Sequence, residues 1–282
     1  MIDLHLHTTA SDGALDPDDL VDAAYRAGVQ TLSITDHDTM AGVPVAASHA
    51  ADLGLEFLPG VEITAVYQCH SIHILGYFLD VSPPGLISFL NTQQEYRVER
   101  ARKIATKLAD LGFPIDIDTL IDQAECKGSV VARPLIATFL VAAGHVSSER
   151  EAFDRWLGDQ RPAYVPFCGS SPSDVVRLIS RVGGVSALAH PGLLGRDELI
   201  PNLSRAGLTA LEAHHSAHNQ SKRAHYTKLA ARHGLAVSGG SDYHGDRHHR
   251  AKFLGAVGPS RDAFNVLLQR LHQVHGVVHG SV

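Results

Sequence analysis

The sequence predicts an α/β fold in which a parallel sheet or barrel carries one helical insertion. Short apolar runs alternate with helical patterns up to residue 83, and the same alternation resumes after residue 165. The segment between these two parts has almost no strand signal. Regular alternation of strand and helix is typical of parallel sheets and α/β barrels.

The elements follow in order along the chain. In the first part we expect strands at 2–7, 31–35, 57–63 and 70–78, with helices after Pro17 and from about Thr39 to Leu53. The second part is predicted to hold a helix from Ser173 to Val182, strands at 185–190, 208–215 and 235–242, and helices after Asp197 and from Gln220 to His233. About seven strand units result, which is enough for a sheet or a barrel.

The middle segment is predicted to be a helical insertion. A long polar helix over 86–112 is followed by shorter helices, without a Ser/Gly-rich linker that would let the segment swing freely. We therefore expect residues 1–83 and 166–282 to form the domain that carries the site. Residues 84–165 are expected to pack on it as a cap that contributes to substrate binding.

Composition limits the class of protein. With 282 residues and 44% hydrophobic content, the chain can bury a sizeable core, and its net charge of −6 gives no global reason to bind long nucleic acid or an anionic membrane. Three cysteines, Cys69, Cys126 and Cys168, are too few and too widely spaced for a disulfide framework. A cytoplasmic location is the expectation.

No membrane anchor or leader is expected. The longest apolar stretch, 130–144, contains Arg133 and Pro134 and is shorter than the roughly 20 residues that span a bilayer. The first predicted strand begins at Ile2, which leaves no room for a charged leader and an apolar region.

The first strand carries the first chemical signal. His5 and His7 are two residues apart, and the period of a strand places both side chains on one face, where they can share a metal ion. A lone histidine is usually structural, whereas a pair on one strand face is harder to explain in that way. Asp12 follows in a Ser-Asp-Gly turn, where an aspartate also commonly serves as a cap.

Further histidines and carboxylates recur where apolar strands end. The carboxyl ends of strands in barrels and parallel sheets converge on one face, so residues far apart in sequence meet in one cleft. Each of these residues alone could be a helix cap, part of a surface ion pair or a core residue. Their recurrence at one strand end after another has no such explanation. The residues are Asp36 and His37, Glu62, His73, His190, and Asp242 with His244.

Six histidines and the three carboxylates Asp12, Glu62 and Asp242, without thiolates, favour Mn²⁺, with Zn²⁺ or Fe²⁺ as alternatives. Nine ligands are too many for one ion but suit three divalent cations if one carboxylate bridges. Three such ions bring +6 and three carboxylates remove 3, and the remaining positive field can hold a hydroxide and a phosphate.

The motifs DLHLHTTASDG, ITDHD, PGVE, HILGY, LAHP and GSDYH resemble those of the PHP (polymerase and histidinol phosphatase) family of phosphoesterases. The resemblance implies a distorted (β/α)7 TIM-like barrel with a helical insertion and a trinuclear metal site. It implies one ion on His5, His7, Glu62 and Asp242, a second on Glu62, His73 and His190, and a third on Asp12, His37 and His244.

Several weaker candidates accompany the nine. Arg133 resembles a phosphate-contacting arginine of nucleotide-hydrolysing members, and Arg196 could reach a second phosphate. His215 and His218 are candidates for contacts with the leaving group or sugar, although a polar loop explains them equally well. Asp36 is expected to orient a metal ligand. The cluster RHHR from Arg247 to Arg250 is interpreted as a solvated loop.

The predicted activity is hydrolysis of a phosphate monoester of a small metabolite by a metal-bridging hydroxide. A nucleotide such as a nucleoside 3′,5′-bisphosphate or AMP is favoured, because the resemblance is closest to those hydrolases. Alternatives are a 5′-3′ exonuclease on short oligonucleotides, a histidinol-phosphate phosphatase, a noncatalytic metal-stabilised module, and a C–N hydrolase. The lack of a basic stripe argues against long polymers.

Overall fold

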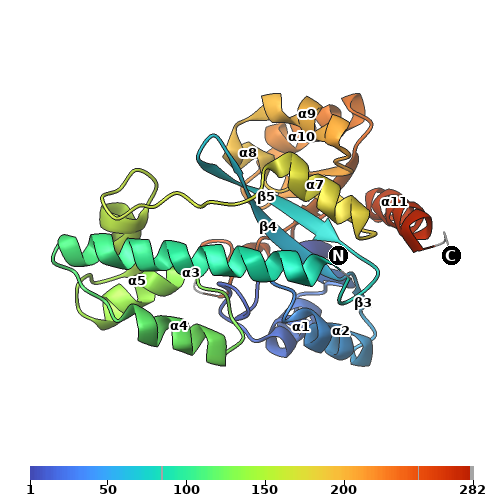
Figure 1. Ribbon diagram of the computed structural model, residues 1–282. Helices are drawn as coiled ribbons and strands as arrows, with labels where there is room; N and C mark the ends of the chain where they lie inside the picture. Colours follow the sequence, from blue (N-terminus) through green and yellow to red (C-terminus); the bar gives the residue numbers. More distant parts are fainter. Residues whose placement is uncertain (84, 247, 280–282) are drawn as a thin grey trace.

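The computed structural model describes residues 1–83, 85–246 and 248–279 (Figure 1). Its strands are β1 (Ile2–Leu6), β2 (Thr31–Ile34), β3 (Glu56–Phe57), β4 (Gly60–Tyr67), β5 (His70–Tyr77), β6 (Val185–Leu188), β7 (Ala210–His215) and β8 (Ala236–Gly240). Its α-helices are α1 (Pro17–Arg26), α2 (Val43–Asp52), α3 (Leu86–Asp110), α4 (Ile117–Cys126), α5 (Arg133–Ala142), α6 (Glu149–Ala152), α7 (Pro172–Arg181), α8 (Pro191–Leu194), α9 (Ile200–Ala206), α10 (Gln220–Arg232) and α11 (Arg261–His279). A π-helix, η1 (Phe153–Leu157), and two 3₁₀ helices, η2 (Asp197–Leu199) and η3 (Ala251–Phe253), complete the described elements.

The strands form two sheets. A three-stranded parallel sheet has the order β1-β2-β3, and a five-stranded sheet has the order β4-β5-β6-β7-β8. In the second sheet β5 is antiparallel to both β4 and β6, while β6, β7 and β8 are parallel. The α/β class is confirmed. The predicted (β/α)7 barrel is not, because the hydrogen-bonded ladder does not close.

The antiparallel pair has a local cause. Only Gln68 and Cys69 connect β4 to β5, and both have positive φ angles, 50° and 65°. Two residues of this conformation make a tight hairpin turn, whereas a parallel neighbour needs a crossover of about a dozen residues. β4 and β5 therefore pair directly, and no helix separates them.

The two sheets meet at two seams, where single bridges replace continuous ladders. At the β1–β8 seam, Leu6 pairs with Tyr243, and Asp242 N donates to His5 O over 2.9 Å. At the β2–β4 seam, His37 pairs with Glu62, whose N donates to Asp36 O over 3.1 Å. Backbone hydrogen bonds thus hold the predicted site residues of different strands beside each other.

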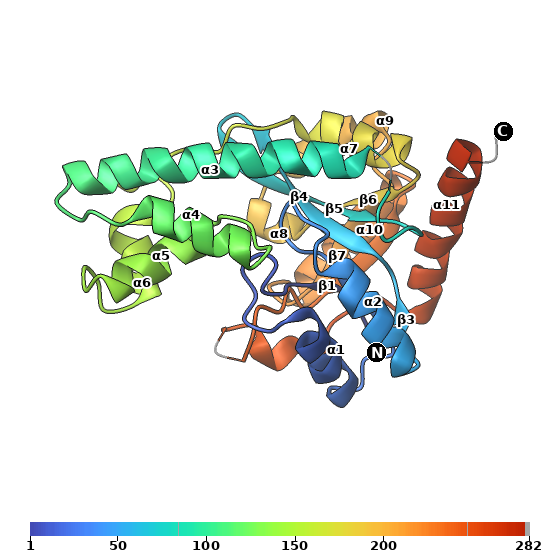
Figure 2. The ribbon, with the colours of Figure 1, turned by 60° about the horizontal axis from the view of Figure 1, so that its bottom comes forward.

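Helix α3 connects the sheets to the insertion, which projects to one side in both ribbon views (Figures 1 and 2). At its start Leu86 and Leu90 pack in the core against the five-stranded sheet. Towards its end Ile104 and Leu108 pack in a separate core with α4 and α5. The described part of 84–165 is helical and irregular and contains no strand. Its own core agrees with an insertion, although the domain boundaries stay a prediction.

The buried stripe of α3 changes character in its middle. There the inward positions hold Gln93 and Arg97 instead of apolar residues. Gln93 Nε2 donates to Thr64 O over 2.8 Å, and Arg97 Nε donates to Asp38 Oδ2 over 2.8 Å. The helix is therefore polar where it crosses the middle of β4 and the loop after β2.

The helices that cover the sheet follow ordinary sequence rules. In α7, Ser171 caps the first turn by accepting from Asp174 N, and Pro172 occupies a position at which no amide donor is needed. Val175, Val176 and Ile179 share one face and are fully buried against the sheet. Among the residues that the structure describes, no helix is both long and apolar enough to cross a membrane.

Candidate metal centre

His5 and His7 present two imidazoles to the same pair of carboxylates. Both side chains are fully buried at the end of β1, and their ring centroids are 5.1 Å apart. His7 Nε2 lies 3.4 Å from Glu62 Oε2 and 3.3 Å from Asp242 Oδ1. His5 Nε2 lies 3.3 Å and 3.6 Å from the same two atoms. The two-residue spacing and the β1–β8 seam together produce this convergence.

Glu62 lies at the middle of the cluster. Its Oε2 faces His5, His7 and, at 3.1 Å, His37 Nδ1. Its Oε1 lies 3.0 Å from His73 Nδ1 and 3.1 Å from His190 Nε2. Each carboxylate oxygen therefore has its own set of imidazoles, which is the arrangement that a bridging ligand requires.

A third group surrounds Asp12, in the loop after β1. Asp12 Oδ1 is 3.3 Å from His244 Nε2, and Oδ2 is 3.8 Å from His37 Nε2. The ring of His244 stacks on that of His7 with a centroid distance of 4.1 Å. Since the two nitrogens of His37 face Asp12 and Glu62, this ring joins the third group to the centre.

The pKa shifts in the cluster are mixed: they suit cation binding for the carboxylates, His37 and His190, whereas neighbouring carboxylates outweigh burial and raise the pKa of His5, His73 and His244. Burial would raise the pKa of Glu62, but His37, His73 and His5 outweigh it and hold that pKa well below its usual range. The pKa of Asp242 is also held well below its usual range, because His5 and a hydrogen bond from His215 outweigh the effect of burial. Burial lowers the pKa of His190 and, more strongly, of His37. Anionic carboxylates and neutral imidazoles are the forms that bind metals.

The donor set fits divalent cations. His5 Nε2, His7 Nε2 and His37 Nδ1 are buried and have no hydrogen-bond partner among the described residues. Ligand atoms about 2.1 Å from a shared ion lie about 3.0–3.4 Å apart at angles near 90–110°, and the separations around Glu62 are of this size. Four groups have ligand atoms within 4.8 Å of one another: His7, Asp12, His37 and His244; His5, Glu212 and His215; His5, His7 and Asp242; and His37, Glu62 and His73.

Asp36 contacts the loop that carries Asp12. It is buried, accepts from Thr8 N over 2.7 Å and Thr8 Oγ1 over 2.6 Å, and accepts from Ser11 Oγ over 2.6 Å. Within the described chain it makes no hydrogen bond to an imidazole. Asp36 therefore orders the loop that carries Asp12, and its expected role in orienting a metal ligand stays a prediction.

The two predicted arginines differ in position. Arg133 begins α5, donates through Nη1 to Leu157 O and Asp159 Oδ1, and lies over the ring of Tyr164 at 5.6 Å. Arg196 lies beside Glu198 at 3.6 Å, and no described hydrogen bond or ion pair joins it to the cluster. The substrate contacts of both arginines stay predictions.

His215 and His218 are engaged inside the protein. His215 is fully buried, donates to Asp242 Oδ2 over 3.1 Å and accepts from Ala217 N over 3.0 Å. His218 donates to Ala213 O over 2.9 Å and accepts from Gly192 N over 3.0 Å. Both ring nitrogens of each histidine are thus engaged, so His215 supports Asp242 and His218 supports the turn after His190, while their contacts with substrate stay a prediction.

The loop after β8 was interpreted as solvated, and Arg250 contradicts this. Its Nη1 donates to Asp242 Oδ2, and its Nε is buried without a partner among the described residues. The ring of His248 lies 4.9 Å from that of His244. Arg247 lies outside the described residues.

Glu212 was missed by the sequence analysis. It is fully buried in β7, where it accepts from His5 Nδ1 over 2.8 Å and from His190 N over 2.6 Å. The available signal was an acidic residue inside the apolar run LTALEAHH, because a charge in a buried strand needs specific partners.

Comparison with known proteins gives the family. A model of the PHP domain matches residues 3–126. The chain is 37% identical over 256 residues to 5′-3′ exoribonuclease Rnm of Escherichia coli, covering 86% of this chain and 84% of the relative. It is 35% identical over 248 residues to a 3′,5′-nucleoside bisphosphate phosphatase of Chromobacterium violaceum, covering 86% and 87%. A crystal structure from Bifidobacterium adolescentis, described as a metal-dependent phosphoesterase, superimposes with a TM-score of 0.86 at 33% identity, covering 95% and 96%.

The fold, the cluster and these relatives define a metal-dependent phosphoesterase. The residues that carry the resemblance are distributed along both halves of the chain, and the relatives match over nearly the same length. The chain belongs to the PHP family, as its six motifs predicted.

Proposed function

We propose that this enzyme removes a phosphate from a small nucleotide, with a nucleoside 3′,5′-bisphosphate or AMP as substrate. The observation that carries the proposal is the position of Glu62 between two sets of imidazoles, which supports a multinuclear metal centre. We assign three divalent ions, Mn²⁺ being favoured, to the nine predicted ligands: His5, His7, Asp12, His37, Glu62, His73, His190, Asp242 and His244. Bound divalent ions lower the pKa of water and neutralise phosphate oxygens.

The side chains of this enzyme have distinct tasks in the proposed reaction. Glu62 and Asp242 are buried beneath the imidazoles, so the attacked phosphate would lie on the partly exposed side of the cluster, close to His73 and His190. Both of these rings are partly exposed, in contrast to His5 and His7. The buried pair is shielded from solvent, and the exposed pair faces the side from which substrate arrives.

The insertion places Arg100 and Arg133 at one aromatic ring, next to Arg97, which is buried against Asp38. Arg97 and Arg100 lie one turn apart on α3, and burial together with Arg133 and Arg97 lowers the pKa of Arg100 to about 10. Mutual repulsion of guanidinium groups favours an anion between them. Tyr164 contributes an aromatic ring to the same region, 5.8 Å from Arg100 and 5.6 Å from Arg133. A second phosphate and a base are suitable partners for this combination.

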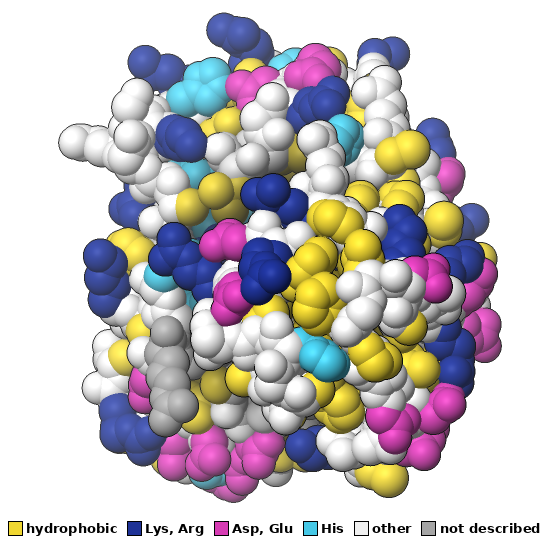
Figure 3. Space-filling view, turned by 90° about the vertical axis from the view of Figure 1, so that its left-hand side faces the viewer, with side chains coloured by type: hydrophobic (Ala, Val, Ile, Leu, Met, Phe, Trp, Pro, Cys, Tyr) yellow, Lys and Arg dark blue, Asp and Glu magenta, His cyan; other side chains and the backbone are white. Residues whose placement is uncertain are grey.

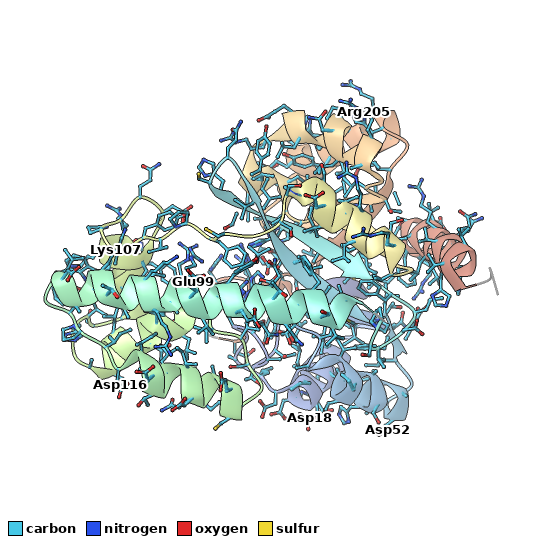
Figure 4. The ribbon with its side chains drawn as sticks, in the orientation of Figure 1. Asp18, Asp52, Glu99, Lys107, Asp116 and Arg205 are labelled. Atoms are coloured by element: carbon cyan, nitrogen blue, oxygen red, sulfur yellow. The ribbon has the colours of Figure 1, made fainter. Side chains whose placement is uncertain are left out.

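A 5′-3′ exonuclease acting on short oligonucleotides is the second candidate. The similarity to an exoribonuclease supports it, since the same chemistry cleaves phosphodiesters. On the face shown in Figure 3, Lys and Arg side chains are interspersed with acidic ones and form no continuous stripe. Glu99 and Lys107 in Figure 4 illustrate this mixture along α3. Long polymers are therefore disfavoured as substrates.

The test is a comparison of substrates with Mn²⁺ present. Phosphate release from adenosine 3′,5′-bisphosphate and AMP is expected, and nucleotide release from a short 5′-phosphorylated RNA would establish the second candidate. Activity confined to histidinol phosphate would contradict both. His190→Ala and Asp242→Ala should abolish turnover while circular dichroism shows a retained fold, and a noncatalytic module would mainly lose melting temperature.

A further inference from the structure

Glu212 is a buried acid with two partners from different parts of the site. It lies in β7 between Leu211 and Ala213, and its side chain is not exposed at all. One oxygen accepts from His5 Nδ1 over 2.8 Å, and the other accepts from His190 N over 2.6 Å. A buried carboxylate is tolerated when its oxygens are satisfied in this way.

The contact with His5 determines which ring nitrogen faces the cluster. Because a carboxylate only accepts, the Nδ1 of His5 carries the proton of this hydrogen bond. The other nitrogen, Nε2, is then free to offer its lone pair, and it lies 3.3 Å from Glu62 Oε2 without a hydrogen-bond partner in the described structure. Glu212 thus presents His5 as a ligand.

The contact with His190 acts on the backbone. His190 has φ 29° and ψ 54°, an unusual conformation for a residue with a side chain, and Pro191 follows it. The hydrogen bond from its N–H to Glu212 holds this conformation, in which His190 Nε2 lies 3.1 Å from Glu62 Oε1. His5 and His190 face opposite oxygens of Glu62, so one carboxylate aligns both sides of the centre.

We propose that Glu212 is a positioning residue that fixes the tautomer of His5 and the backbone of His190, so that both imidazoles meet Glu62 as metal ligands. The inference rests on the metal assignment of the proposed function. A rival role is direct ligation, since His5, Glu212 and His215 also form a compact group. The hydrogen-bond distances favour positioning, because both oxygens of Glu212 are already engaged by N–H donors.

Glu212→Gln is the informative variant. An amide has one acceptor oxygen, so it satisfies only one of the two donors. If that oxygen stays on His190 N–H, the amide NH₂ faces His5 Nδ1 and favours the proton on Nε2, where it blocks ligation. Mutation of such hydrogen-bond partners typically weakens metal binding by about 10–100-fold. Glu56→Gln is the matched control, because Glu56 pairs with Arg261 at the surface.

The experiment titrates metal-free wild-type and variant proteins with Mn²⁺ alone and measures affinity and stoichiometry by calorimetry. We expect Glu212→Gln to bind the same number of ions about 10–100-fold more weakly, with turnover recovering at high Mn²⁺, and Glu56→Gln to match the wild type. Unchanged affinity with a lower melting temperature would reduce Glu212 to a structural residue. Loss of an entire ion at saturation would establish ligation and overturn positioning.

A measurement on the wild type keeps the inference testable if the variant does not fold. In Zn²⁺-loaded protein with ¹⁵N-labelled histidine, His5 should show a coordinated Nε2 and a protonated Nδ1. A coordinated Nδ1 and a protonated Nε2 would overturn the inference about Glu212, but this result would not contradict the proposed phosphatase function. A wild-type protein that binds no divalent ion would instead refute the metal assignment itself.

Discussion

The attachment of the insertion to the site depends on a buried ion pair that can be removed. Asp38 is fully buried, follows His37 directly, and accepts through Oδ2 from Arg97 Nε over 2.8 Å. The side chain of Arg97 is 8% exposed, and its Nη2 also donates to Thr64 Oγ1 over 2.9 Å. Arg97→Met keeps much of the apolar stem of Arg97 but leaves the Asp38 carboxylate without its cation.

The magnitude follows from burial. Removing one partner of a buried ion pair costs about 3–5 kcal/mol, because the remaining charge has neither water nor a counter-ion. The lost bond to Thr64 accounts for only about 0.5–1.5 kcal/mol of stability, which Thr64→Val measures separately. Arg97→Met should therefore destabilise by about 3–5 kcal/mol, clearly more than Thr64→Val.

Equilibrium unfolding in urea, followed by circular dichroism, measures these differences. Asp38→Asn is a suitable second change, because asparagine tolerates the positive φ of 52° at this position. The double variant removes the unpaired charge, so it should recover at least about 2 kcal/mol relative to Arg97→Met. Destabilisation below about 1 kcal/mol, or strict additivity in the double variant, would refute this account of the ion pair.

Four further predictions follow from the structure. Burial lowers the pKa of His218 to about 4 from 6.5, so its unfolded form binds protons more readily. The contribution of His218 to the free energy of unfolding should be fully present above pH 6.5 and should fall by about 2 kcal/mol between pH 7 and 5. Urea unfolding should detect this fall in the wild type but not in His218→Asn. Saturating Mn²⁺ should raise the melting temperature relative to chelator, because an ion at a hundredfold excess over its Kd contributes about 2.7 kcal/mol, and equal melting curves would contradict metal binding. A Cβ at Gly258 would lie 1.7 Å from Ile2 O, so Gly258→Ala should cost about 3 kcal/mol or more by calorimetry. Gly276→Ala, with nothing within 4 Å, should stabilise α11 by about 0.5–1 kcal/mol.

Much of the site could be predicted because its signals are local. His5 and His7 are two residues apart at the end of β1, and His190 and Asp242 follow the ends of β6 and β8, whereas Glu62 lies near the start of β4. Parallel strands bring such ends together whatever the details of closure. The sequence therefore sufficed to predict the cluster, even though the predicted barrel was not confirmed.

The errors arose where pairing is decided by a few residues. The turn at Gln68 and Cys69 makes β5 antiparallel, but neither residue is a glycine or asparagine that would signal a tight turn. The contacts of His215 and His218 inside the protein were not predicted either, although β7 ends at His215 as expected. Such contacts depend on the register of β7 against β8, which one sequence does not specify.

The position of the site at the seams explains how the fold tolerates so many ionisable groups. Where the ladder is interrupted, single backbone bonds join His5 to Asp242 and Asp36 to Glu62. These bonds fix the backbones from which the candidate ligands project, so the cluster does not depend on attraction among its own side chains. In this arrangement three imidazole nitrogens, of His5, His7 and His37, are buried without a hydrogen-bond partner among the described residues. Burying them without a partner costs free energy. Divalent cations recover that cost on binding. The same interruption that prevents a closed ladder therefore produces the affinity for metal on which phosphoester hydrolysis depends.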